Sequence, residues 1–190
     1  MTLFSVIKAP PETEPVTLAE MRAHLGIGQA DDTDRDTIIT RRIVTARMIA
    51  ESYIRSGIVT QTWTAYGDAF DRIIALKAPL QSVTSFQYLD ADGVLQTVDP
   101  SVYEVDTVSH CVLPAPGQQW PTPGRSVNSV QIEYVIGYAT IPEPIKDAIK
   151  FIVGWLENYQ RGIEGSSPLM GVPMAAKQLL DYYVDWRSVV

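Results

Sequence analysis

Apolar residues near the start of the chain recur at helical spacing. The segment Thr17-Leu18-Ala19-Glu20 has the sequence of a capping box, in which the side chains of Thr17 and Glu20 each accept a hydrogen bond from the other residue's backbone amide. It predicts a short helix that ends at Gly26. A second helical pattern begins among the aspartates after Ala30 and ends before Gly57, with apolar residues at Ile39, Ile43, Ala46, Ala50 and Tyr53. This helix would be roughly 33 Å long at a rise of 1.5 Å per residue.

From Ile58 the pattern changes to the period of two that is typical of strands. β-Branched and aromatic residues alternate with polar ones, and an Asp90-Ala91-Asp92-Gly93 turn predicts a hairpin. The expected strands cover residues 59–66, 72–76, 83–89, 94–97, 102–105 and 129–135. A loop rich in proline and glycine separates the last two of these strands. The section predicts a small antiparallel β unit.

Helical spacing returns at Pro142-Glu143-Pro144, since prolines in a first helical turn cost no hydrogen bond. One helix is predicted up to Arg161-Gly162, and a last helix over about 173–186. The sequence therefore predicts an α+β protein, in which helices from both ends of the chain form a bundle. Its expected parts are an extended lead over 1–16, a helical body over 17–57 and 142–190, and an antiparallel β insert over 58–141.

The composition, with 46% apolar and 19% charged residues, is that of a globular protein rather than a disordered one. One cysteine, Cys111, excludes an internal disulfide and a cysteine zinc site. No apolar run approaches the length of about 18 residues that a membrane helix needs. The first residues lack the basic start and apolar core of a signal peptide. We expect a soluble protein from a reducing compartment, with no membrane association.

The net charge of −7 is unevenly distributed. Residues 57–141 carry three basic and eight acidic residues and so supply −5 of it. A protein that grips nucleic acid needs lysine and arginine to neutralise phosphates. The charge therefore argues against specific DNA binding, although DNA could slide past such a surface.

The candidate chemical groups do not form a recognisable catalytic or metal-binding motif. Asp31, Asp32, Asp34 and Asp36 are closely spaced, but the glycine and glutamate of an EF-hand loop are missing, and acidic residues favour a helix start without metal. His110 and Cys111 are adjacent, yet consecutive side chains of a strand point to opposite faces. We expect no catalytic residue, no metal and no cofactor. A small hydrolase whose acidic residues converge only in the fold is the alternative from another functional class.

Two features favour contacts with other proteins. Arg41, Arg42 and Arg47 lie along the long predicted helix, and the chain contains ten arginines but only five lysines, a bias typical of interfaces. A solvated helix face is the simpler interpretation. The chain ends in Tyr182, Tyr183, Trp186, Val189 and Val190. Core packing would explain Tyr183 and Trp186. For Val189 and Val190, a segment bound to a partner is nearly as good an explanation as packing within the molecule.

The order of several motifs resembles the head–tail connector (adaptor) proteins of long-tailed phages. The resemblance covers roughly residues 15–160. Its motifs, in chain order, are Pro15 to Leu25, an aspartate-led helix over 36–51, Gln61-Thr62-Trp63, Pro79 to Val83, Tyr88-x-Asp90-x-Asp92-Gly93, Tyr103-x-Val105-Asp106, Gln119-Trp120-Pro121, Ile132-x-Tyr134-x-x-Gly137-Tyr138 and the helix from Pro142 to Tyr159. Gene transfer agents, which are phage-derived particles, use similar proteins.

The resemblance implies a structural virion protein that is assembled in the bacterial cytoplasm and located at the head–tail junction. Such connectors form a ring, commonly twelve-fold, below the portal protein, and DNA passes through its channel. The implied partners are the portal, further copies of the chain and a stopper or tail-completion protein. We assign Arg41, Arg42 and Arg47 to subunit contacts. We assign Tyr182, Trp186, Arg187, Val189 and Val190 to portal docking. A stopper or tail-completion protein of the same particle is the nearest alternative.

Overall fold

The computed structural model describes residues 3–28, 33–160 and 172–186. Its helices and antiparallel sheets confirm the predicted α+β class. The chain divides into two units, one formed by Met1–Glu12 with Thr60–Tyr138 and the other by Thr13–Val59 with Ala139–Val190. We call them the β unit and the helical unit and describe each by itself.

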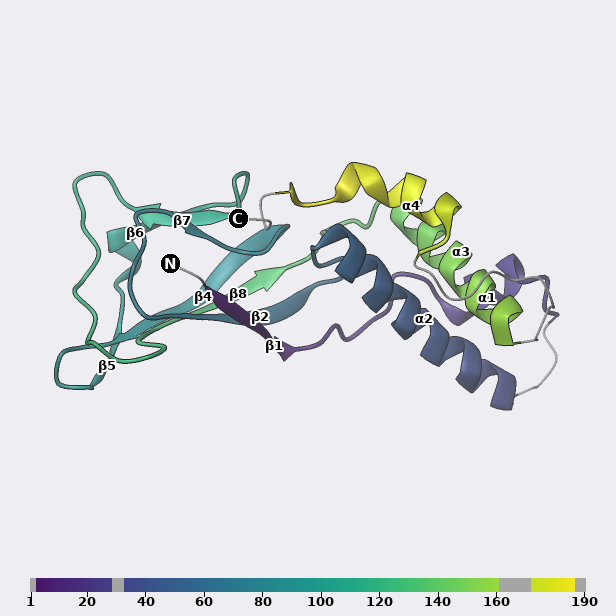
Figure 1. Ribbon diagram of the computed structural model, residues 1–190, viewed down its shortest axis with the longest axis horizontal. Helices are drawn as coiled ribbons and strands as arrows, with labels where there is room; N and C mark the ends of the chain where they lie inside the picture. The colour runs from purple at the N-terminus through teal and green to yellow at the C-terminus, as the bar shows by residue number, and fades with distance from the viewer. Residues whose placement is uncertain (1–2, 29–32, 161–171, 187–190) are drawn as a thin grey trace. The chain divides into compact units, whose positions relative to one another are not determined.

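The larger sheet of the β unit has five strands. Their spatial order is β1 (Phe4–Ala9), β2 (Gln61–Gly67), β8 (Val130–Ile136), β4 (Leu80–Leu89) and β5 (Leu95–Thr97), and every neighbouring pair is antiparallel (Figure 1). Strand β8 lies at the centre, and its Val130, Ile132, Tyr134 and Ile136 are buried while the residues between them are less so. This alternation is the period of two expected for a strand with one face on a core.

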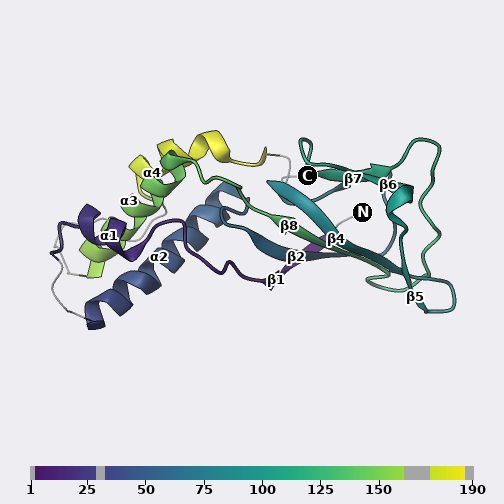
Figure 2. The ribbon, with the colours of Figure 1, turned by 180° about the vertical axis from the view of Figure 1, so that it is seen from behind.

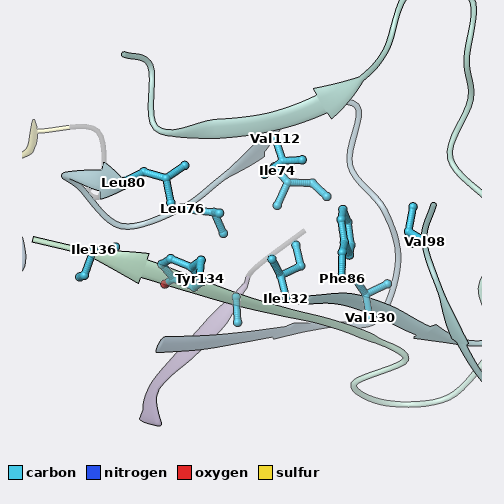
Figure 3. Packing of buried hydrophobic residues seen from close by; sticks show 11 residues of the cluster. Ile74, Leu76, Leu80, Phe86, Val98, Val112, Val130, Ile132, Tyr134 and Ile136 are labelled. Atoms are coloured by element: carbon cyan, nitrogen blue, oxygen red, sulfur yellow. The ribbon is translucent and has the colours of Figure 1, made fainter. Parts of the chain in front are cut away.

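A second sheet of three strands covers part of that core. It contains β3 (Ile74–Ala75), β7 (Cys111–Pro114) and β6 (Tyr103–Asp106), in this order, and the short 3₁₀ helix η1 (Pro100–Val102) leads into β6. Figure 3 shows Ile74 and Val112 of this sheet directed toward Phe86 and Ile132 of the larger one, all four of them buried. The packing of the two sheets against each other explains why the short strands of the second sheet are stable.

The β4–β5 hairpin confirms the predicted Asp90–Gly93 turn. The carboxylate of Asp90 accepts hydrogen bonds from the amides of Asp92 (3.0 Å) and Val94 (2.9 Å), and Gly93 has a φ of 76°, which favours glycine. The amide of Gly124 donates to the carbonyl of Leu89 at 2.7 Å, which holds the long loop against this hairpin. The sequence motif thus fixes both the turn and a docking point for the loop.

The helical unit contains α1 (Leu18–His24), α2 (Thr33–Ile54), α3 (Glu143–Gln160) and α4 (Met174–Leu180), followed by the 3₁₀ helix η2 (Asp181–Tyr183) (Figure 2). Helix α3 packs against both α2 and α4. The buried residues come from α2, α3 and α4 and are Ile39, Ile43, Ala46, Ala50, Ile54, Ile145, Ala148, Ile149, Ile152, Val153, Ala176 and Leu180. Most of them are the positions that helical spacing selects from the sequence. Over the residues described, no helix is long and apolar enough to cross a bilayer.

The capping box at the start of α1 is confirmed. The amide of Glu20 donates to the hydroxyl of Thr17 at 3.2 Å, and the amide of Thr17 donates to the carboxylate of Glu20 at 2.7 Å. The bond from the Thr17 amide and a second one from the Thr17 hydroxyl, also 2.7 Å long, lower the pKa of Glu20, because both stabilise the ionised carboxylate. These two residues therefore satisfy amides that the first helical turn leaves without partners.

Three elements differ from the sequence-based prediction. Part of the expected extended lead is strand β1, which pairs with β2 more than fifty residues later. Strand β7 is not predicted by the sequence, because its residues Cys-Val-Leu-Pro show no alternation of apolar and polar positions. The last helix ends at Leu180 and continues as a 3₁₀ turn, rather than reaching Trp186.

Candidate assembly surfaces

Arg47 of α2 lies at the centre of an ion-pair cluster within the helical unit. Its guanidinium contacts Glu14 at 2.8 Å and Glu51 at 2.7 Å, and its exposed fraction is 6%. Glu51 also accepts a hydrogen bond from the amide of Ile58 at 3.0 Å. Burial alone would lower the pKa of Arg47, but the bonds to Glu14 and the charge of Glu51 outweigh it and raise that pKa. We call Arg47, Glu14 and Glu51 the Arg47 cluster.

The other two arginines assigned to subunit contacts differ from each other. Arg42 forms an ion pair with Glu157 of α3, and both side chains are largely buried. Arg41 is exposed on the same helix. The charges of Arg42 and Arg47 are therefore directed at carboxylates of their own unit, and Arg41 is the member of the three that is presented to solvent.

A further ion pair connects the first two helices. The guanidinium of Arg22 on α1 lies 3.0 Å from the carboxylate of Asp36 on α2. Asp36 and Asp34 occupy the first turn of α2, where negative charge is favoured by the helix dipole. Asp31 and Asp32, the other two aspartates of the candidate metal cluster, lie outside the described residues.

The segment that follows α4 is fastened to the end of α2. The hydroxyl of Tyr53 donates to the carboxylate of Asp181 at 2.5 Å, and the amide of Asp185 donates to the carbonyl of Ile54 at 2.8 Å. The bond to Asp181 raises the pKa of Tyr53, because the bond exists only with the protonated hydroxyl. These two contacts hold η2 and the residues after it beside α2.

Two aromatic side chains of this segment extend into solvent. The exposed fraction is 90% for Tyr182 and 70% for Trp186. The alternative that Trp186 packs into the core is therefore wrong, because the helix ends six residues earlier and no longer directs this side chain inward. The other residues assigned to portal docking, Arg187, Val189 and Val190, lie outside the described residues.

A hollow of about 850 Å³ opens between α2 and this segment, within the helical unit. Its lining is mostly apolar and aromatic, with Met48 and Trp186 exposed at the surface. The full set of lining residues is Thr45, Met48, Ile49, Ser52, Tyr53, Arg55, Val172, Val184 and Trp186. A hollow with exposed apolar groups at its rim is typical of a site that receives side chains from another protein.

The histidines and acidic residues serve structural contacts. The Nδ1 atom of His110 accepts the amide hydrogen of Leu80 at 3.2 Å, and the ring of His24 packs edge-on against Phe151. His110 has a φ of 52° and lies in the turn that directly precedes β7, whereas Cys111 is the first residue of that strand. Within the described ranges, no three His, Cys, Asp or Glu side chains lie close enough to hold a metal ion.

Several carboxylates of the β unit are used by turns. Asp99 accepts from the amide and hydroxyl of Ser101, and Asp106 accepts from the amides of Val108 and Ser109. The pKa values of Asp99 and Asp106 are lowered by these bonds, as is that of Asp90 by its bonds to Gln96 and Val94. These groups therefore stay ionised well below neutral pH, and they keep the β unit acidic.

The fold matches chains of solved virus-like particles along nearly its whole length. A chain from the neck of an empty gene transfer agent (GTA) particle, determined with C6 symmetry, is 18% identical, with a TM-score of 0.73 and coverage of 96% of this chain and 95% of that one. The fold is one that occurs in GTA necks. A chain from the virion of a native GTA particle is 20% identical, with a TM-score of 0.72 and coverage of 96% and 95%.

A third chain comes from the neck of a native GTA particle determined with C12 symmetry. It is 19% identical, with a TM-score of 0.66 and coverage of 96% of this chain and 94% of that one. No protein-family model matches the sequence, and neither does any curated protein. The likeness is therefore one of fold, and it includes both the helical and the β unit.

Proposed function

We propose that this chain is a structural head–tail connector (adaptor) subunit of a tailed phage or gene transfer agent. Copies of it form a ring below the portal, join head to tail and continue the DNA channel. The observation that carries this proposal is the fold match over 96% of the chain to a GTA neck chain that is itself covered to 95%. The match includes both the helical unit and the β unit.

The charge of the β unit supports a channel through which DNA passes without being held. The β unit contains four basic residues, Lys8, Arg72, Lys77 and Arg125, against nine acidic ones. Such a surface releases few counterions from DNA and repels its phosphates. The ring assignment is supported by the C6 and C12 symmetry of the necks that contain the matching chains.

We assign portal docking to the hollow beside α2 and to the exposed Tyr182 and Trp186. Trp186 lines this hollow and Tyr182 is exposed on the same segment, and large aromatic residues are enriched among the anchors of protein interfaces. Arg187, Val189 and Val190 continue directly from Trp186 and belong to the same proposed contact. Arg41 remains the candidate for a subunit contact, whereas Arg42 and Arg47 would contribute by fixing α2 in place.

The test is electron microscopy of the purified chain mixed with the portal protein of the same particle. We expect a ring of density directly below the portal that is absent without this chain. A bare portal, together with binding of the chain to an already complete adaptor ring, would contradict the adaptor role and establish the stopper or tail-completion alternative.

A further inference from the structure

The five-stranded sheet of the β unit ends in two open edges. Strand β1 forms one edge and β5 the other, and no strand of the described chain pairs with the outer side of either. On either side of β5, the carbonyl of Val94 accepts a hydrogen bond from the amide of Asp90, just after β4, and the amide of Val98 donates one to the carbonyl of Phe86 in β4. Since backbone groups alternate in direction along a strand, those of Leu95 and Thr97 point away from β4. Both edges thus carry backbone groups available to another strand.

Each open edge also carries exposed apolar side chains. The exposed fractions are 67% for Phe4 and 51% for Ile7 on β1, and 54% for Val94 and 53% for Leu95 at β5. Natural edge strands are usually protected by charges, bulges or prolines. On β1 such protection begins only after Ile7, with a bulge, Lys8 and the prolines that follow. Phe4 to Ile7 therefore form an unprotected apolar edge.

The two edges are unlike each other but run in the same direction. Because all four neighbouring pairs are antiparallel, the first, third and fifth strands of the sheet are parallel to one another. A copy placed beside this one in the same orientation would thus bring its β1 parallel to β5. Contacts between two different surfaces of identical copies are the kind that close into rings, whereas a two-fold dimer uses one surface twice.

We propose that β5 of one copy pairs in parallel with β1 of the next copy, so that the five-stranded sheets of neighbouring copies join around the ring. Charge does not oppose this pairing, because β1 contains no acidic residue and its Lys8, which pairs with Glu133 of its own copy, stays half exposed, while β5 is flanked by Asp90, Asp92 and Asp99. Because β5 has only three residues, this pairing is one part of the subunit contact, and its main effect is to fix the register between neighbouring copies. This inference rests on the ring of the proposed function.

The test uses cysteine cross-linking of the full chain on portal complexes. In a Cys111→Ser background, Ile7→Cys and Leu95→Cys are made singly and together, and a short bismaleimide is added after assembly. We expect the doubly substituted chain to give a ladder of covalent oligomers and a mixture of the two single variants to give dimers only. The matched control is Ile7→Cys with Val108→Cys, another exposed residue of the β unit, which should not cross-link.

A charge variant provides a second readout that does not depend on cross-linking geometry. Ile7→Asp places a carboxylate opposite the acidic β5 hairpin, and we expect at least about a tenfold rise in the concentration needed for ring assembly, the effect of roughly 1.4 kcal/mol. Adding Leu95→Lys to the same chain should restore assembly. Unchanged unfolding of both variants would show that the protomer is intact.

The outcomes separate the edge contact from the proposed function. Rings that form at the portal without a cross-link between positions 7 and 95, and with normal assembly of Ile7→Asp, would overturn the edge contact but keep the connector role. Cross-linking of Ile7→Cys to itself would replace it by a two-fold contact. Cross-linking of position 7 to the portal would show that the edge receives a portal strand instead. A wild-type chain that forms no ring at the portal would overturn both proposals.

Discussion

Replacing Arg47 by alanine is expected to destabilise the helical unit strongly. The guanidinium is nearly inaccessible, and it contacts two carboxylates, those of Glu14 and Glu51. The substitution would leave both carboxylates without their counter-charge and would create a space where the side chain was. Removing one partner of a fully buried ion pair costs about 3–5 kcal/mol, whereas an exposed pair contributes about 0–1 kcal/mol.

The magnitude follows from how exposed the partners are. The side chains of Glu14 and Glu51 are 23% and 15% exposed, so water can partly solvate them after the arginine is removed. We therefore expect a loss of about 2–4 kcal/mol in the free energy of unfolding, below the upper end for buried pairs. Arg41→Ala, on the exposed side of the same helix, should change it by less than about 0.5 kcal/mol.

The assay is urea unfolding followed by circular dichroism at 222 nm, which reports on the helices. A double-mutant cycle with Glu14→Ala would isolate the pair, because its coupling free energy excludes the effect of the cavity. Equal stabilities of the Arg47→Ala and Arg41→Ala variants would refute the reasoning. So would a coupling free energy near zero between Arg47 and Glu14, since the cluster would then contribute nothing through charge.

Three further predictions concern single side chains. Gly124→Ala should lower the free energy of unfolding by about 1–3 kcal/mol, because the new Cβ would lie 2.3 Å from a hairpin carbonyl; Gly154→Ala, with open space and a helical position, should instead raise it by up to about 1 kcal/mol. Tyr53→Phe should cost stability at neutral pH, and its difference from wild type should vanish in unfolding measurements at higher pH. The raised pKa of Tyr53 makes its contribution complete below the ordinary tyrosine value of about 10, and it is lost as the pH rises through the folded value. Trp186→Ala should leave unfolding unchanged within about 0.5 kcal/mol but weaken portal binding in a pull-down by tenfold or more, as for an interface anchor; unchanged binding would remove Trp186 from the proposed contact.

The elements that the sequence predicts correctly are those whose cause is local. The capping box of Thr17 and Glu20 lies within four residues, and the turn at Asp90 to Gly93 contains its own hydrogen-bond acceptor and its own positive φ. Helix α2 repeats its apolar positions over six turns, which is enough for periodicity to identify the buried face. In each case, the residues that determine the structure are close neighbours in the chain.

The features that the sequence did not reveal depend on distant partners. Strand β1 has no period of its own and is a strand because β2 pairs with it. Glu14 precedes Arg47 by 33 residues, so the spacing rule that predicts the Arg47–Glu51 pair cannot detect it. The exposure of Trp186 depends on where helix α4 ends, and helix ends are set by contacts such as that of Asp181 with Tyr53.

The excess of arginine over lysine favours a role of the α2 arginines in contacts with other proteins, whereas the structure shows Arg47 stabilising its own unit. The chain passes between the two units after Glu12, after Val59 and after Tyr138. Arg47 binds Glu14, near the first of these points, and through Glu51 the amide of Ile58, near the second. One buried side chain therefore fixes, within the helical unit, two segments that lead directly to the β unit. An arginine can do this because its rigid fork of donors binds two carboxylates at once, which a lysine cannot reproduce. The subunit contacts that we propose would then rely on groups that the protomer does not use itself, namely the exposed Arg41, the apolar hollow beside α2 and the open edges of the five-stranded sheet.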